Sequence, residues 1–311
     1  MDIFLYAFNG VSPVFIVILL GIFLQKLKFF SEKTKDELVK LVFYVGTPAL
    51  IFNSVSSANL YESFNLNFIS FILIAILILI ALVIALCAFI KDNAKKAAVI
   101  QIGFRSNFAI IGMPLAKYLL DEAGVSETAV LLSFVVITYN IMVSIVLSYY
   151  TGKERNFKAI LLNILKNPLI IGTAAGLLFA VLQVKIPKFL VSSLDIVGQT
   201  AMSVGLLILG ATITLKGFRE NGFYIMYAVF IRNFLSPLLF ITSAVLLGFR
   251  GNEVIITAIL SAAPAAVNCF VMAKKMGADA EISAFGVSFT SVFSILGVFL
   301  AVYLIKSLGY A

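Results

Sequence analysis

Histidine and tryptophan are absent from this chain of 311 residues, and only two cysteines are present. The lack of histidine excludes His-based triads, histidine metal ligands and histidine proton relays. Cys87 and Cys269 each lie alone in an apolar run, so the sequence offers no disulfide framework, zinc knuckle or CxxC redox pair. We therefore expect neither a metal nor a cofactor, and too few chemical groups for an enzyme.

Charge is also scarce, since 12% of the residues are charged and 62% are hydrophobic. A soluble domain is nearer half apolar and a quarter charged. The composition therefore predicts an all-α, multi-pass membrane protein. The formal charge of +8 would favour nucleic acid in a soluble protein, but here the basic residues lie in short gaps between apolar runs. They indicate orientation in a bilayer and no nucleic-acid partner.

Ten apolar runs are long enough to cross the bilayer, which takes about 20 residues each. The predicted spans are 4–25, 36–57, 66–90, 94–119, 124–150, 159–183, 189–215, 221–248, 252–273 and 280–305. The start, Met1-Asp2-Ile3, has no basic region, so the first run is expected to be a retained span.

The basic residues predict the orientation of these spans. Fifteen Lys and Arg residues fall in the odd-numbered gaps, and five fall in the even-numbered gaps and the termini. The odd gaps are therefore expected in the cytoplasm, with both termini outside the plasma or inner membrane.

Ten spans divide into two halves, 1–152 and 153–311. Because each half holds an odd number of spans, a duplicated unit would be an inverted repeat, as in secondary transporters. Ala116-Lys117 and Ala273-Lys274 support the duplication, because they end the fourth and ninth spans at a spacing of 157 residues. Each pair precedes a short acidic stretch and a long apolar run.

The fourth and ninth spans carry residues that interrupt helices. The fourth contains Gly103, Arg105, Asn107 and Pro114, and the ninth contains Pro264. Proline removes a backbone donor and clashes with the carbonyl four residues earlier. In hydrocarbon, the freed peptide groups must be buried by protein or line a wet cavity. Two breaks therefore predict a polar site near the midplane, where half-helix amino ends suit an anion. The alternative is a pair of proline kinks in packed helices.

Arg105 lies close to mid-depth of the predicted fourth span, and Asp195 is the carboxylate that the prediction places inside a span away from its ends. An arginine at mid-depth costs about 2.5–3.5 kcal/mol on insertion scales. Arg105 either clamps a carboxylate, neutralises carbonyls at the helix break or pairs with Asp195. Asp195 is the candidate for proton coupling; the alternative is an acid at the outer interface near Lys185 and Lys188.

Several amides are candidates for the site. Asn107 and Asn268 lie beside the breaks and can bind a carboxylate, or else hydrogen-bond between helices. The second-rank lining candidates are Asn53, Asn140 and the pair Thr290-Ser291.

Other features are interpreted as structural. Arg232 and Pro237 lie in the eighth span, and Gly172-Thr-Ala-Ala-Gly176 is a small-xxx-small motif that favours close helix packing.

Four stretches together resemble the auxin efflux carrier family, the PIN-like transporters with their bacterial members. They are Gly103-Phe-Arg-Ser-Asn-Phe-Ala-Ile-Ile-Gly-Met-Pro-Leu115, Asn167-Pro-Leu-Ile-Ile-Gly172, Leu209-Gly-Ala-Thr-Ile-Thr-Leu215 and Ala263-Pro-Ala-Ala-Val-Asn-Cys-Phe-Val-Met-Ala-Lys274. The likeness follows span order over essentially the whole chain.

The resemblance implies ten helices in two inverted five-helix repeats, with the fourth and ninth spans crossing as broken helices. It implies a scaffold of the first, second, sixth and seventh spans, an elevator-type transport part made of the others, and a homodimer through the scaffold. Asn107 matches the family's crossover asparagine and Pro264 its crossover proline, whereas Ser106 stands where the plant pattern has proline. Family substrates are small organic anions, such as indole-3-acetate or dicarboxylates.

The sequence therefore predicts a secondary efflux carrier for a small organic anion; the alternative is a PIN-like receptor that binds its ligand without turnover. The predicted substrate contacts are Asn107, Asn268, Arg105, Ser106, Pro264, Asn53 and Asn140, with Gly103, Pro114 and Pro264 at the helix breaks. Proton coupling, sodium coupling and uniport all stay open.

Overall fold

A computed structural model describes residues 13, 16–57, 65–152, 162, 165–213 and 215–310. In this part of the chain the regular structure is helical, apart from one isolated antiparallel bridge between Ser106 and Ala265. Six of its helices are long and apolar enough to cross a membrane: Glu32–Ser56, Leu66–Leu86, Glu122–Thr151, Lys188–Thr212, Lys216–Leu246 and Ala280–Ser307. The all-helical membrane class is thus confirmed.

These six helices occupy the predicted second, third, fifth, seventh, eighth and tenth spans. The first and sixth predicted ranges contain the shorter apolar helices Ile16–Lys26 and Pro168–Val181. The fourth and ninth contain interrupted helices. Residue 4, where the first span was predicted to start, and residue 153, where the second half was predicted to start, lie outside the described residues.

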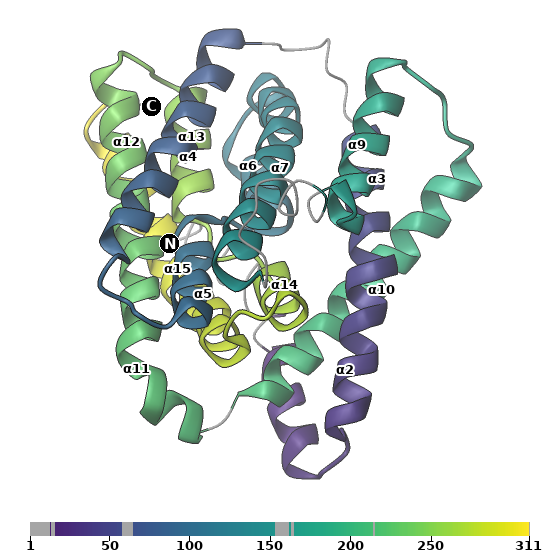
Figure 1. Ribbon diagram of the computed structural model, residues 1–311. Coiled ribbons are helices and arrows are strands. Elements are labelled where there is room, and N and C mark those ends of the chain that lie inside the picture. Colours follow the sequence, from purple (N-terminus) through teal and green to yellow (C-terminus); the bar gives the residue numbers. More distant parts are fainter. Residues whose placement is uncertain are drawn as a thin grey trace.

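One group of helices packs together at one side of the molecule (Figure 1). It consists of α2 (Glu32–Leu41), α3 (Thr47–Ser56), α9 (Pro168–Val181) and α10 (Lys188–Thr212). The α9 helix lies very close to α3, because a Cβ atom added at Gly172 would stand 2.9 Å from the Pro48 carbonyl oxygen. At Gly176 it would stand 3.0 Å from the Phe52 carbonyl oxygen. The motif predicted to allow close packing therefore does so.

The remaining helices form the rest of the molecule (Figure 1). They are α4 (Leu66–Leu86), α5 (Asn93–Phe104), α6 (Met113–Leu119), α7 (Glu122–Thr151), α11 (Leu215–Phe230), α12 (Ser236–Leu246), α13 (Asn252–Ala262), α14 (Asn268–Met276) and α15 (Ala280–Ser307). In Figure 1, α5, α6, α7 and α14 lie between the first group and the helices α4, α11, α12, α13 and α15.

Three helices widen by one π-type turn directly before a proline. The turns are η1 (Val42–Gly46), η2 (Phe108–Gly112) and η3 (Ile231–Leu235), and they precede Thr47-Pro48, Met113-Pro114 and Ser236-Pro237. In each case the residue before proline donates its N–H to the carbonyl five residues earlier. The wider turn accommodates the proline ring, which would clash with the carbonyl four residues back. The helix expected to break at Pro114 therefore continues through it.

Aspartates cap the starts of α7 and α15, the long helices that follow the predicted fourth and ninth spans. Asp121 accepts a hydrogen bond from the Gly124 N–H at the start of α7, and Asp279 accepts one from the Ile282 N–H at the start of α15. An aspartate side chain satisfies one of the N–H groups left free at a helix start.

Candidate functional site

The two interrupted helices meet at their breaks. The first break separates α5 from η2, and the second separates α13 from α14. Across the breaks, the Asn107 N–H donates to the Pro264 carbonyl over 2.7 Å, and the Ala266 N–H donates to the Arg105 carbonyl over 3.3 Å. These paired bonds form the isolated bridge, so each interruption supplies partners for backbone groups freed by the other.

Pro264 also leaves carbonyl groups of α13 without helical donors. Because proline has no N–H, the Leu260 carbonyl loses the donor that a continuous helix would place four residues later. The Ser106 hydroxyl donates to this carbonyl over 2.7 Å. The Ala265 N–H is also diverted from α13, because it donates to the Thr290 hydroxyl over 3.0 Å.

Arg232, in η3, binds the carbonyl ends of both interrupted helices. Its Nε donates to Ala263 over 3.0 Å, and its Nη1 donates to Phe104 over 3.1 Å. Its Nη2 donates to Leu260 and Ser261 over 3.0 and 2.6 Å. Arg232 therefore has the structural role that was predicted for it. It neutralises the helix carbonyls at the break, a role that the sequence had also left open for Arg105.

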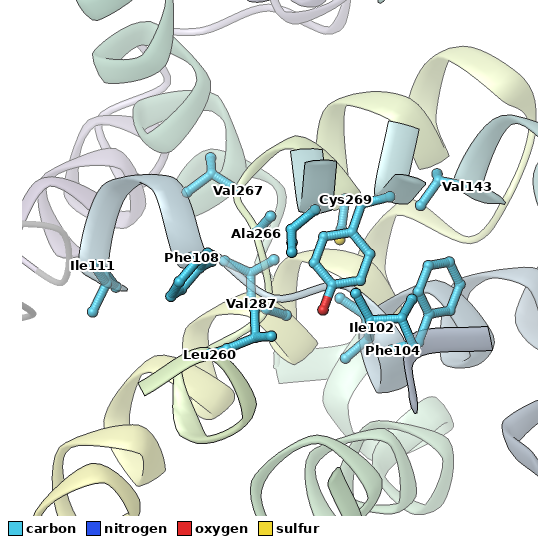
Figure 2. Close-up of a cluster of buried hydrophobic side chains, with 14 of the residues drawn as sticks. Ile102, Phe104, Phe108, Ile111, Val143, Leu260, Ala266, Val267, Cys269 and Val287 are labelled. Carbon is cyan, nitrogen blue, oxygen red and sulfur yellow. The ribbon is translucent and has the colours of Figure 1, made fainter. Parts of the chain in front are cut away.

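Apolar side chains surround the crossing, and Figure 2 shows them arriving from both interrupted helices and from α7 and α15. Phe104 and Phe108 lie on either side of Ala266 in this view. Phe104 and Phe108 are almost fully buried, which keeps water away from the bonded carbonyls and strengthens their interaction with the guanidinium.

A cavity of about 160 Å³ lies on the side of the crossing where η2 and α14 begin. Its polar lining residues are Ser54, Arg105, Ser106, Asn107, Tyr139, Asn140 and Asn268. Among the described residues that line it, none is Asp or Glu. Helix starts carry partial positive charge, so both the helix ends and the side chains make this cavity attractive to an anion.

Arg105 is held in place from two helices. Its Nη2 donates to the Asn140 side-chain oxygen over 2.8 Å, and its Nη1 contacts the Met272 sulfur at 2.9 Å. Asn140 in turn donates to the Thr173 hydroxyl over 3.3 Å. A guanidinium has five N–H donors, so these two bonds use only part of its capacity. The alternative pairing of Arg105 with Asp195 is not formed, because the guanidinium contacts Asn140 and Met272 whereas the Asp195 carboxylate accepts from the Gln199 side chain over 2.7 Å.

The other predicted site residues divide into two sets. Asn107, Asn268, Ser106 and Asn140 line the cavity with Arg105, and Asn268 also accepts a hydrogen bond of 3.4 Å from the Thr47 hydroxyl. The cavity lining does not include Asn53, Pro264, Gly103 or Asp195, and the side chain of Pro114 lies outside the part that the structure describes.

Asn53 and Pro264 nevertheless lie close to the site. Leu50 and Ser54, on the same helix as Asn53, line the cavity, and the Asn53 side-chain oxygen is buried without a hydrogen-bond partner among the described atoms. Pro264 contributes its backbone carbonyl to the bridge.

Sequence reasoning missed Tyr139, which lines the cavity and faces both the Arg232 side chain and the Ser106 backbone. The signal that the sequence offers for Tyr139 is its position directly before Asn140, a predicted lining residue.

A helical membrane fold with a polar cavity between the ends of interrupted helices is the arrangement of a membrane transporter. The chain matches the family described as "Membrane transport protein" over residues 6–303. It belongs to this family, the auxin efflux carriers.

Two relatives extend the comparison. A protein of Rhizobium meliloti (strain 1021) named "Putative malonate transporter" is 26% identical over 304 residues, which cover 96% of this chain and 95% of the relative. An uncharacterized transporter of Methanocaldococcus jannaschii is 23% identical over 290 residues, which cover 91% of this chain and 94% of the relative.

Proposed function

We propose that the chain is a secondary efflux carrier for a small organic anion, which binds in the cavity beside the crossing. One observation carries the proposal: the polar lining combines the Arg105 guanidinium with the starts of two half-helices and, among the described residues, contains no carboxylate. Arg105 would bind a carboxylate, with Asn107, Asn268, Asn140 and Ser106 as hydrogen-bond partners.

A small dicarboxylate is the first substrate to consider. One relative is named as a malonate transporter, and the cavity is small and flanked by apolar residues such as Leu50 and Val135. Auxin-like monocarboxylates such as indole-3-acetate are the second class, since they present one carboxylate to Arg105 and an apolar body to the wall.

We further propose ten spans in two inverted repeats, residues 1–152 and 153–311, with both termini outside. The matched aspartate caps at Asp121 and Asp279 support this symmetry. The group α2, α3, α9 and α10, together with the helix Ile16–Lys26, would be the scaffold and the dimer interface. The other helices would carry the substrate across in an elevator-type movement.

Counterflow in proteoliposomes tests the function. Vesicles preloaded with unlabelled malonate should take up labelled malonate. A panel of other dicarboxylates, monocarboxylates and indole acids should inhibit this uptake more strongly the better they fit the cavity. Saturable exchange of any carboxylate in the panel supports a carrier. Binding to the purified protein without exchange would instead identify a receptor.

A further inference from the structure

Four backbone carbonyls from two different helices converge on a single side chain. The oxygens of Phe104, Leu260, Ser261 and Ala263 lie 2.6–3.1 Å from nitrogen atoms of Arg232. Carbonyl ends of interrupted helices carry partial negative charge, and in ion-coupled carriers such groups coordinate Na⁺. The geometry here is therefore that of a cation site with an arginine inside it.

The interruptions themselves create the need for a positive charge at this point. Pro264 cannot donate to Leu260, and the Ala265 N–H donates to Thr290, so carbonyls at the end of α13 have lost their helical partners. Water does not replace these partners freely, because Arg232 is only 1% exposed. Its guanidinium supplies several donors and a charge that proteins do not remove by deprotonation.

We propose that Arg232 is a tethered cation that fills a monovalent-cation site at the crossing, and that shortening its side chain opens this site to Na⁺. Arg232 acts as a positioning residue: it fixes the ends of α5 and α13, and through Tyr139 its side chain adjoins the substrate cavity. This inference goes beyond the proposed function, because it holds whichever anion the cavity accepts.

Thermal unfolding of the full-length protein in detergent tests the proposal. Wild type, Arg232→Ala and Arg232→Lys are compared in sodium chloride and in choline chloride at equal ionic strength, about 0.15 M. In choline, Arg232→Ala should melt well below wild type. Added Na⁺ or a low concentration of guanidinium should raise its melting temperature saturably and by more than that of wild type, because a ligand of the folded state stabilises it. Arg232→Lys should fold in choline and respond less to Na⁺, since its ammonium keeps the charge.

Arg250→Ala is the matched control. Arg250 also donates to backbone carbonyls at a helix end, those of Val245 in α12 and of Phe249 just after it, over 3.0 and 2.6 Å, but it is exposed. Water can replace it there, so its removal should create no Na⁺ dependence.

Two results would overturn the proposal. In the first, Arg232→Ala is folded and its melting temperature is no more sensitive to Na⁺ than that of wild type. In the second, neither Arg232→Ala nor Arg232→Lys folds in any of the salts, which would show that the shape of the guanidinium matters and its charge alone does not suffice. Because the readout is melting and not transport, failure of this proposal is distinct from failure of the carrier assignment.

Discussion

At the scale of single residues, the sequence left open for Arg105 the roles of clamping a carboxylate and of neutralising carbonyls at the helix break. The structure gives the second of these roles to Arg232. Arg232 binds the carbonyl ends of both interrupted helices, whereas Arg105 belongs to the cavity lining. Arg105 is 5% exposed, so its charge acts in a low-dielectric setting where a carboxylate partner would bind strongly.

Replacing Arg105 tests its role as the carboxylate clamp. Arg105→Ala should weaken substrate binding about 10- to 100-fold, because a hydrogen bond to a charged group contributes about 1.5–3 kcal/mol. Arg105→Lys should recover only part of this, since an ammonium lacks the bidentate geometry. The measurement is the concentration dependence of uptake in proteoliposomes. The control is Arg219→Ala, which removes an exposed arginine of α11 and should transport normally. If Arg105→Ala bound the substrate as tightly as wild type, Arg105 would not be a substrate contact.

At the scale of elements, small residues of α9 allow its close contact with α3 in the first group. Gly176→Val on α9 would force a branched side chain against the Phe52 backbone and Val55 of α3. Overpacking of this kind costs about 1–3 kcal/mol, so the variant should melt at a lower temperature than wild type. Gly222→Ala on α11 is the matched control, because nothing lies within 4 Å of the added Cβ atom, and it should be neutral or stabilising. Equal melting of Gly176→Val and wild type would contradict the packing seen here.

The cap of α7 makes a prediction about pH. Hydrogen bonds from the Gly124 N–H and the Asn252 side chain hold the pKa of Asp121 below its usual value. A lowered folded-state pKa means that the cap stabilises the fold above the unfolded pKa, about 3.9, and that this contribution disappears as the pH falls through the folded value. Asp121→Ala should therefore melt below wild type at neutral pH, and the difference should vanish in strong acid.

Thermal unfolding from neutral pH down into strong acid, below the folded-state pKa of Asp121, measures this difference. Glu122→Ala alters the exposed neighbour of Asp121 without removing the cap, and its melting should follow wild type throughout. A difference between Asp121→Ala and wild type that stayed constant with pH would show that the carboxylate charge is not what the cap uses.

Apolar runs and prolines in the sequence predicted the helices better than they predicted the contacts between residues of different helices. The apolar runs located the six long helices, and Pro264 marked the second interruption. The first interruption falls at Arg105–Asn107, where the Ser106–Asn107 pair predicted one, and not at Pro114. Backbone partners from the other broken helix stabilise the extended chain there. The partners of Arg232 lie 28 to 128 residues away, and no spacing rule connects residues so distant in sequence.

At the scale of the whole molecule, the net movement of charge tests how transport is driven. If the carrier is a uniporter, a potential of about 100 mV should concentrate a monoanion about 50-fold on the positive side, since that field is worth about 2.3 kcal/mol per charge. Vesicles with an imposed potassium diffusion potential, with and without a pH gradient, provide the measurement. In a proton-coupled carrier the pH gradient would drive accumulation instead, and Asp195→Asn would abolish that response if Asp195 carries the proton.

The bridge between the broken helices does not itself require a particular side chain at residue 106. Its two bonds use the N–H of Asn107 and the C=O of Arg105, so neither depends on the side chain or the N–H of Ser106. Proline, which the related plant pattern has at this position, would keep this pairing, but it would lose the hydroxyl that donates to the Leu260 carbonyl and the N–H that faces Tyr139. A proline here would leave the Leu260 carbonyl to Arg232 alone, so residue 106 can change how firmly the two broken helices are held together while the bridge itself stays intact.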